Sequence, residues 1–161
     1  MKVKNNVEIL DITHSDLVNL FSTALYGSSY LSVEYNKEFY NSLPASKKEG
    51  DCLEDAIADV LLNGGEVYLY DGYAEGEVYS DSGKVIKEEY GDDEYVQYTI
   101  TLADVIEGLQ KAASGTYKAN DDNEFAKQSF DRFAEDECMD FDIVNADALM
   151  QIIMFNEIIY G

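Results

Sequence analysis

The sequence predicts an α+β fold in which an antiparallel meander of three to four strands packs with about five helices. Hydrophobic residues recur at helical spacing near both ends of the chain, whereas between Glu66 and Ile100 they alternate with a period of two. The order of helices, then strands, then helices favours helices packed on one face of a single sheet. Because 161 residues is the size of one ordinary domain, we expect residues 1–161 to form a single acidic α+β domain.

A first amphipathic helix is expected between Thr13 and Gly27. Thr13 and Asp16 have the spacing of a capping box, which satisfies free N–H groups at the start of a helix. Gly27 is a typical residue for the C-terminal stop. The apolar residues between these ends fall at i, i+3, i+4, i+7 and i+8, namely Leu17, Leu20, Phe21, Ala24 and Leu25.

Residues 28–50 are ambiguous, because residues 30–35 alternate like a strand while Pro44 and its polar neighbours mark a loop. Asp51 is then expected to cap a second helix that ends at Asn63, before two glycines. Acidic residues occupy the side of this helix opposite its apolar stripe. The stripe itself is expected at Leu53, Ala56, Ile57, Val60 and Leu61.

The meander is expected in the middle of the chain. The tetrapeptide Gly-Glu-Val-Tyr occurs at residues 65–68 and again at 76–79, which suggests two successive strands. Side chains two residues apart on a strand share a face, so we expect Glu75 and Glu77 to lie on one face. Turn sequences rich in Asp, Ser and Gly separate the apolar runs at residues 71–72, 81–83 and 91–93.

Three more helices are expected after the strands. The first begins at Thr101 and stops at Gly115, and the second begins at Asp121 or Asp122. The last begins near Asn145 and is apolar on almost all sides. A helix of this kind is usually buried inside the fold or in a subunit contact. We therefore place the apolar C-terminal helix centrally, against the sheet.

The negative charge of the chain is unevenly distributed. The formal net charge is -22, of which residues 1–50 contribute -1 and residues 51–161 contribute -21. An aromatic content of 12% separates the chain from disordered acidic tails, which are poor in aromatic residues. The sequence contains neither a secretory signal nor an apolar run long enough to span a membrane, so we expect a cytoplasmic protein without membrane contact.

No sequence motif indicates an enzyme. His14 is the only histidine, and nothing around it supports a Ser/His/Asp triad, so we expect it to be structural or solvent-exposed. Cys52 and Cys138 are far apart and form no CxxC pair, which indicates neither a disulfide framework nor a zinc site. Glycine-rich nucleotide-binding motifs are also absent. We therefore expect no catalytic residue, no metal site and no cofactor.

A weak calcium site is one alternative, because Ca²⁺ takes oxygen ligands from acidic loops. Residues 121–124, or Asp140 with Asp142, are the nearest candidates for such ligands. Helix caps and solvated turns are the simpler interpretation of the same acids.

The excess of carboxylates excludes direct binding of nucleic acid, because neutralising phosphates requires clustered Lys and Arg. It favours a basic protein partner instead, such as a nucleic-acid-binding or defence protein. Acids two apart on a strand or four apart on a helix are spaced like neighbouring phosphates, and tyrosines among them add contact area. The expected interaction surface comprises Glu54, Asp55, Asp59, Glu75, Glu77, Asp104, Glu107, Asp131, Glu135, Asp136, Tyr68, Tyr70 and Tyr79.

Parts of the chain resemble a family of small acidic proteins of phages and conjugative elements of gut bacteria. The resemblance rests on FAKQSFD at 125–131, LMQIIMFNEIIYG at 149–161, DVLLNGG at 59–65 and EGEVY at 75–79, and it spans most of residues 52–161. It implies no activity and no site residues, but it implies interference with a host defence or DNA-handling protein. In size and acidity the chain is also similar to antirestriction DNA-mimic proteins, whose sequence motifs it lacks.

These observations lead to one principal hypothesis and two alternatives. The principal hypothesis is a non-enzymatic protein, monomeric or homodimeric, that presents a nucleic-acid-like anionic surface to a basic partner. The alternatives are an accessory or structural protein of a mobile element that assembles through its apolar C-terminal helix, and a weak Ca²⁺-binding module.

Overall fold

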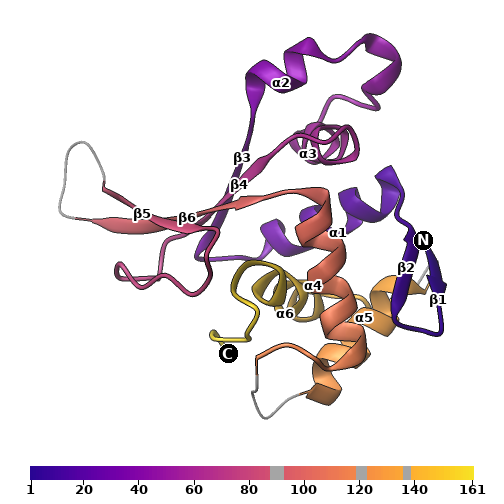
Figure 1. Ribbon diagram of the computed structural model, residues 1–161, viewed down its shortest axis with the longest axis vertical. Coiled ribbons are helices and arrows are strands. Elements are labelled where there is room, and N and C mark those ends of the chain that lie inside the picture. Colours follow the sequence, from indigo (N-terminus) through magenta and orange to yellow (C-terminus); the bar gives the residue numbers. More distant parts are fainter. Residues whose placement is uncertain (88–92, 119–122, 136–138) are drawn as a thin grey trace.

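The computed structural model describes residues 1–87, 93–118, 123–135 and 139–161. Within these residues the chain has an α+β fold with six α-helices, a four-stranded antiparallel sheet and a separate two-stranded sheet (Figure 1). The fold class predicted from the sequence is therefore confirmed. In chain order the elements are β1 (Lys2–Lys4), β2 (Glu8–Asp11), α1 (His14–Tyr26), β3 (Leu31–Tyr35), α2 (Lys37–Ser42), a 3₁₀ turn (Ala45–Lys47), α3 (Leu53–Leu62), β4 (Val67–Asp71), β5 (Gly83–Lys87), β6 (Glu94–Ile100), α4 (Leu102–Ser114), α5 (Asn123–Ala134) and α6 (Ile143–Phe155).

The strands of the larger sheet run in the order β3-β4-β6-β5, and each neighbouring pair is antiparallel. One of them, β3, comes from the segment that the sequence left ambiguous. The prediction of a strand at the second Gly-Glu-Val-Tyr copy is wrong, because residues 72–82 form a loop. Glu75 and Gly76 both have positive φ, which is incompatible with an extended strand. The tetrapeptide repeat therefore does not mark two successive strands.

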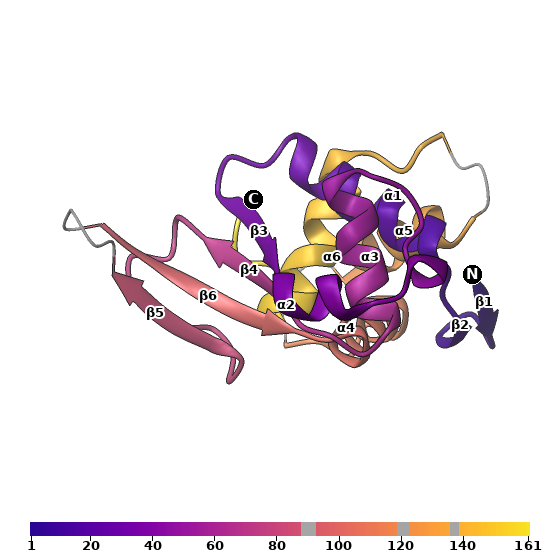
Figure 2. The ribbon, with the colours of Figure 1, turned by 90° about the horizontal axis from the view of Figure 1, so that it is seen from above.

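The two faces of this sheet differ in what covers them. On β4 and β6, buried residues such as Leu69 and Tyr98 alternate with half-buried ones such as Tyr70 and Gln97. The helices gather on the buried side and at one end of the sheet, while the β5–β6 hairpin extends beyond them (Figure 2). The side chains on the other face are only half-buried and therefore contact solvent.

Helix α6 is the central element, as the sequence predicts. All its residues from Asn145 to Phe155 except Asp147 are buried, and it packs against α1, α4 and α5. It meets the sheet mainly through its end, where the ring of Phe155 lies 5.2 Å from that of Tyr98. Gly108 allows α4 to approach α6 closely, because a Cβ there would lie 2.5 Å from Ile153 Cγ1.

Most of the helix ends follow the sequence signals. The capping boxes of Thr13 and Thr101 are formed, and Gly115 ends α4 in the left-handed conformation. The start of α3 differs by one residue, because Cys52 rather than Asp51 is its N-cap. Leu53, expected in the buried stripe of α3, is 45% exposed because it lies in the first turn, at the edge of the packed region.

Candidate interaction surface

The acids on α3 do not form the solvated row that the sequence predicts. Asp59 is buried, with 2% of its surface exposed. Its Oδ1 lies 3.1 Å from Nδ1 of His14 on α1, and its Oδ2 accepts a hydrogen bond from the backbone N–H of Glu49 at 2.9 Å. Asp55 Oδ1 lies 2.8 Å from the other ring nitrogen of His14. The assignment of Asp59 to the interaction surface is wrong, because α1 packs against α3 and covers it.

His14 is therefore the centre of an internal contact between two helices. Burial lowers the pKa of His14, but the hydrogen bond to Asp55 and the charges of Asp59 and Glu49 together raise it above its ordinary value. Hydrogen bonds from His14 and from the backbone N–H of Cys52 lower the pKa of Asp55 in turn. A protonated ring carries an N–H on each nitrogen: Nε2 is hydrogen-bonded to Asp55, while Nδ1 lies within ion-pair distance of Asp59 but forms no hydrogen bond among the described residues. This arrangement stabilises the fold and confirms the structural role expected for His14.

Glu75 and Glu77 are exposed, but they lie in the loop between β4 and β5 and do not share a strand face. The hydroxyl of Tyr79 donates a hydrogen bond to Glu77 at 2.9 Å, and this bond raises the pKa of Tyr79 to about 12. The Tyr79 ring packs at 5.5 Å from Phe155, on the helix side of the sheet. Tyr79 therefore fixes the loop against α6 and does not lie beside the other predicted tyrosines.

Tyr68 and Tyr70 do lie together, on the open face of the sheet. The Tyr70 hydroxyl donates to Glu34 on β3 at 3.0 Å and accepts from Gln97 on β6 at 2.8 Å. Its ring lies 5.5 Å from that of Tyr95. Neither Glu34 nor Gln97 is among the predicted site residues, and for Glu34 the reason is that the position of β3 beside β4 is not evident from the sequence. A shallow hollow of about 450 Å³ on this face is lined by Tyr30, Ser32, Glu34, Tyr70, Gly72 and Tyr95.

The predicted acids on α4 and α5 are accessible to different degrees. Asp104 is half-buried, and its Oδ2 accepts hydrogen bonds from the backbone N–H and the hydroxyl of Thr101. Glu107 is exposed and forms an ion pair with Lys111 at 3.0 Å. Asp131 and Glu135 are exposed on and just after α5. Asp136 lies outside the described residues, as do Asp121 and Asp122, which the sequence suggests as caps or calcium ligands.

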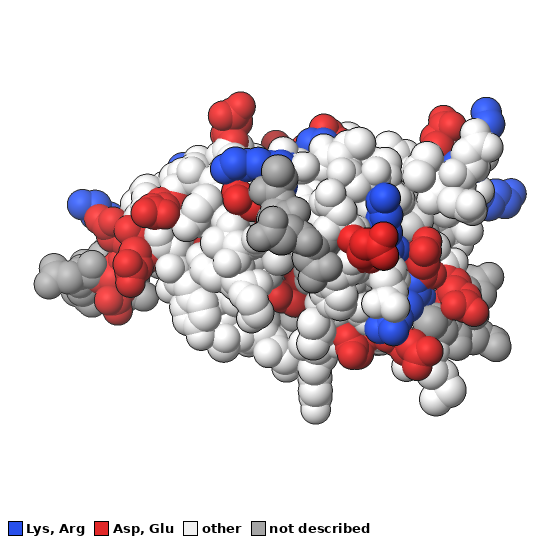
Figure 3. Space-filling view, turned by 90° about the horizontal axis from the view of Figure 1, so that it is seen from below, with Lys and Arg blue, Asp and Glu red and all other residues white. Residues whose placement is uncertain are grey.

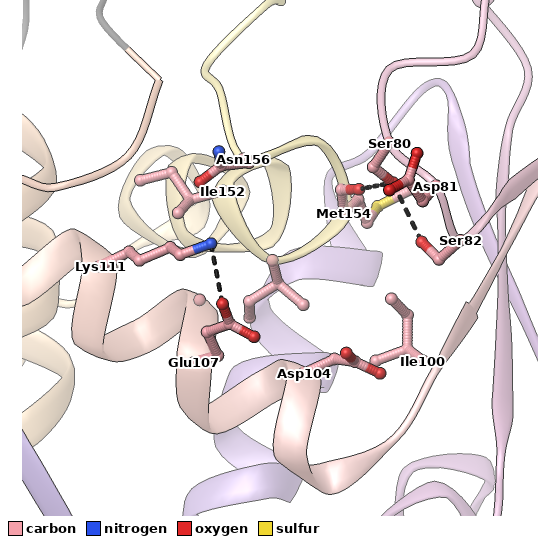
Figure 4. A pocket seen from close by; sticks show the side chains of 12 residues that line it. Ser80, Asp81, Ser82, Ile100, Asp104, Glu107, Lys111, Ile152, Met154 and Asn156 are labelled. Atoms are coloured by element: carbon pink, nitrogen blue, oxygen red, sulfur yellow. Dashed lines mark hydrogen bonds and ion pairs between the residues drawn. The ribbon is translucent and has the colours of Figure 1, made fainter.

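Asp104 and Glu107 border a pocket of about 350 Å³ between α4, the end of α6 and the loop before β5 (Figure 4). Asp81 from the loop lies on the opposite side of this pocket from Glu107 (Figure 4). We call it the α4–α6 pocket. Its other lining residues are Ser80, Ser82, Ile100, Gly108, Lys111, Ile152, Ile153, Met154 and Asn156. The sequence identified Asp81 only as a turn residue and gave no signal that it would line a pocket together with residues of α4.

The acids do not form one continuous track on the face shown in Figure 3. Many of them lie in two groups, one at the end of the β5–β6 hairpin and one toward the opposite end of the molecule, and the surface between them carries scattered acidic and basic residues. Among the described residues, amines pair with few carboxylates. The pairs other than those of His14 are the N-terminus with Asp16, Lys87 with Glu94, Lys111 with Glu107 and Lys118 with Glu157.

Within the described ranges, no helix is both long enough and apolar enough to span a bilayer. No three His, Cys, Asp or Glu side chains in the same ranges are arranged to hold a metal ion. Comparisons of the chain with family models, curated proteins and solved structures give no match. The resemblance to small acidic proteins of phages and conjugative elements therefore stays a prediction.

Proposed function

We propose that this protein is a cytoplasmic, non-enzymatic acidic protein of a mobile element that binds a basic protein, one that itself binds nucleic acid or acts in host defence. The observation that carries the proposal is the lack of charge compensation. The chain has a formal charge of -22, and beyond the His14 contact only four carboxylates of the described residues pair with an amine. The negative electrostatic field of these uncompensated carboxylates attracts cationic proteins and raises their association rate.

We do not propose that the acidic surface copies the regular phosphate spacing of a nucleic acid strand. Asp59 is turned inward, and Glu75 and Glu77 lack the regular strand spacing, so these positions do not reproduce a row of phosphates. On the face shown in Figure 3, the exposed acids form separate groups instead. Binding through separate groups of carboxylates requires a partner with several Lys or Arg clusters rather than one uniform groove.

The alternative of assembly through α6 depends on the apolar pattern of this helix. From Ala146 to Phe155 the apolar residues of α6 are buried within this chain, and Phe155 is only 1% exposed, whereas Ile143 and Val144 in the first turn are exposed. Burial inside the fold explains the apolar pattern of the helix without a second subunit. We therefore do not place a homodimer contact on α6.

The proposal is tested by capturing proteins from a bacterial lysate on the immobilised chain and measuring the affinity of each captured protein after purification. We expect a basic partner whose affinity falls steeply as the salt concentration rises and whose binding is competed by duplex DNA. The absence of any captured basic protein, or a partner whose affinity changes with neither salt nor DNA, would contradict the proposal.

A further inference from the structure

We infer that the α4–α6 pocket accepts the cationic side chain of an arginine or lysine. For its natural ligand the inference rests on the proposed function, because the basic partner supplies that side chain. The pocket itself has a chemistry that is independent of which partner binds.

The volume of the pocket suits one long side chain. About 350 Å³ corresponds to roughly ten water molecules at about 30 Å³ each. The pocket combines an apolar wall with an acidic rim. Ile100, Ile152 and Ile153 line the pocket but are at most 8% exposed, so they offer the methylene groups of a long side chain only a small contact, while the carboxylates lie where its charged end would remain partly hydrated.

The charge of the pocket is negative even after its own lysine is counted. Asp81, Asp104 and Glu107 oppose Lys111, whose ammonium pairs with Glu107 at 3.0 Å. No amine among the described residues pairs with Asp81 or Asp104. A bound guanidinium or ammonium group would therefore compensate charges that the chain leaves open.

The end of α6 adds to the negative potential. The last carbonyl groups of a helix carry a partial negative charge, and α6 ends at Phe155, directly at the pocket. Ser80 donates to the carbonyl oxygen of Met154 at 2.8 Å and the backbone N–H of Asn156 to that of Ile152 at 2.9 Å, so two of these groups are satisfied. The field of the helix end still favours a cation in the pocket.

Asn156 gives an independent indication of a missing donor. Its Oδ1 is buried and has no hydrogen-bond partner among the described residues, although Asn156 lines the pocket. A buried acceptor without a partner costs free energy, and native structures rarely leave one. The N–H groups of an arginine or lysine side chain are donors of the required kind, and they reach this buried oxygen only when the Asn156 side chain turns toward the pocket.

The hollow on the open face of the sheet is a weaker candidate for the same role. It contains one carboxylate, Glu34, which already accepts a hydrogen bond from Tyr70. It also lacks a helix end and an unpaired acceptor. The charge complementarity to a basic side chain is therefore concentrated in the α4–α6 pocket.

The test is a titration of the isotope-labelled protein with N-acetylarginine amide, in which the NMR chemical shifts of the backbone amides are measured at each ligand concentration. The neutral isostere N-acetylcitrulline amide is the ligand control. We expect saturable shifts at residues 80–82, 108 and 154–156 with the arginine compound alone, at a dissociation constant on the order of millimolar for so small a ligand. Shifts that are equal for both compounds, or that appear only elsewhere, would overturn the inference.

Two variants separate the pocket from the general charge of the chain. Asp81→Asn removes one carboxylate from the pocket, whereas Asp131→Asn removes the same charge from α5, whose residues do not line it. We expect Asp81→Asn to weaken binding roughly threefold or more, and Asp131→Asn to leave it nearly unchanged. Equal effects of the two variants would contradict a specific site.

The failure of this inference is distinguishable from failure of the proposed function. If the lysate experiment yields a salt-sensitive basic partner whose affinity is unchanged by Asp81→Asn, the proposed function stands and the pocket is excluded. If the arginine compound binds the pocket but no basic partner is captured, the pocket stands as a cation site and the proposed function is contradicted.

Discussion

Helices α3 and α4 both carry acids in their first two turns, yet the two sets have opposite surroundings. Asp55 and Asp59 of α3 face His14 on α1 and are bound inside the fold. Asp104 accepts hydrogen bonds from Thr101, and Glu107 pairs with Lys111, but both also border an open pocket. The comparison teaches that the neighbours of a helix, rather than its own acidic pattern, decide whether its carboxylates are enclosed by a second helix or border a pocket that a partner can enter.

The largest expected effect comes from breaking the inward set. Asp59→Ala leaves His14 without one carboxylate and leaves the backbone N–H of Glu49 without its acceptor. We expect the free energy of unfolding to fall by about 3 kcal/mol, as is usual when one partner of a buried pair is removed. Urea unfolding measures this change. Asp81→Ala is the matched control, for which we expect a change within about 0.5 kcal/mol; equal losses would contradict the distinction between the two sets.

The next largest effect is expected at Gly108, where α4 packs against α6 beside the α4–α6 pocket. In Gly108→Ala the new Cβ would lie 2.5 Å from Ile153 Cγ1 and 2.7 Å from its Cα, so α4 and α6 must separate. We expect a loss of about 1–3 kcal/mol, the range typical of overpacking, together with weaker binding of N-acetylarginine amide. Ala103→Ser, on the exposed side of α4, serves as the control. A Gly108→Ala variant with unchanged stability would show that the two helices are not in tight contact.

The pH dependence of stability sharpens the comparison further. Because the folded-state pKa of His14 is raised, its contribution is fully present below the unfolded value of about 6.5 and is lost as pH rises through the higher folded value. We expect the free energy of unfolding to decrease between pH 6 and pH 8.5. Urea unfolding across this range should show a smaller decrease for His14→Asn, and an identical slope in both proteins would contradict the raised pKa.

The smallest expected effect is on the outward set. Glu107 is 63% exposed at its side chain, and its pair with Lys111 is on the helix surface. Glu107→Gln should lower the free energy of unfolding by about 0.3–0.5 kcal/mol, the usual value for exposed helix pairs. Thermal unfolding in low and high salt checks this. A loss close to that of Asp59→Ala would show that the outward acids also hold the fold together.

Local signals predicted much of the fold. The capping boxes at Thr13 and Thr101 and the left-handed stop at Gly115 depend on residues close in sequence, and the structure contains all three. The buried character of α6 followed from its composition. The strand at residues 76–79 was predicted wrongly, because the positive φ of Glu75 and Gly76 is not evident from an alternating pattern.

The candidate site was much less predictable. The contact of His14 with Asp55 spans 41 residues, and Asp81 lines a pocket with α4 only because the loop before β5 reaches the end of α6, where Ser80 donates to Met154. Such contacts depend on tertiary packing, which the spacing of acids along one helix does not contain. Glu34 was hidden for the same reason, since the pairing of β3 with β4 joins residues 36 positions apart.

The central claim is that the exposed carboxylates, rather than the buried ones, bind a basic partner. It is tested most directly by neutralising four of them in one variant, Glu75→Gln, Asp81→Asn, Asp131→Asn and Glu135→Gln, all exposed and none paired with an amine among the described residues. The measurement is the affinity of the captured partner at two salt concentrations. We expect unchanged folding, weaker binding and a smaller dependence on salt. A folded variant that binds with the original affinity and the original salt dependence would contradict the claim.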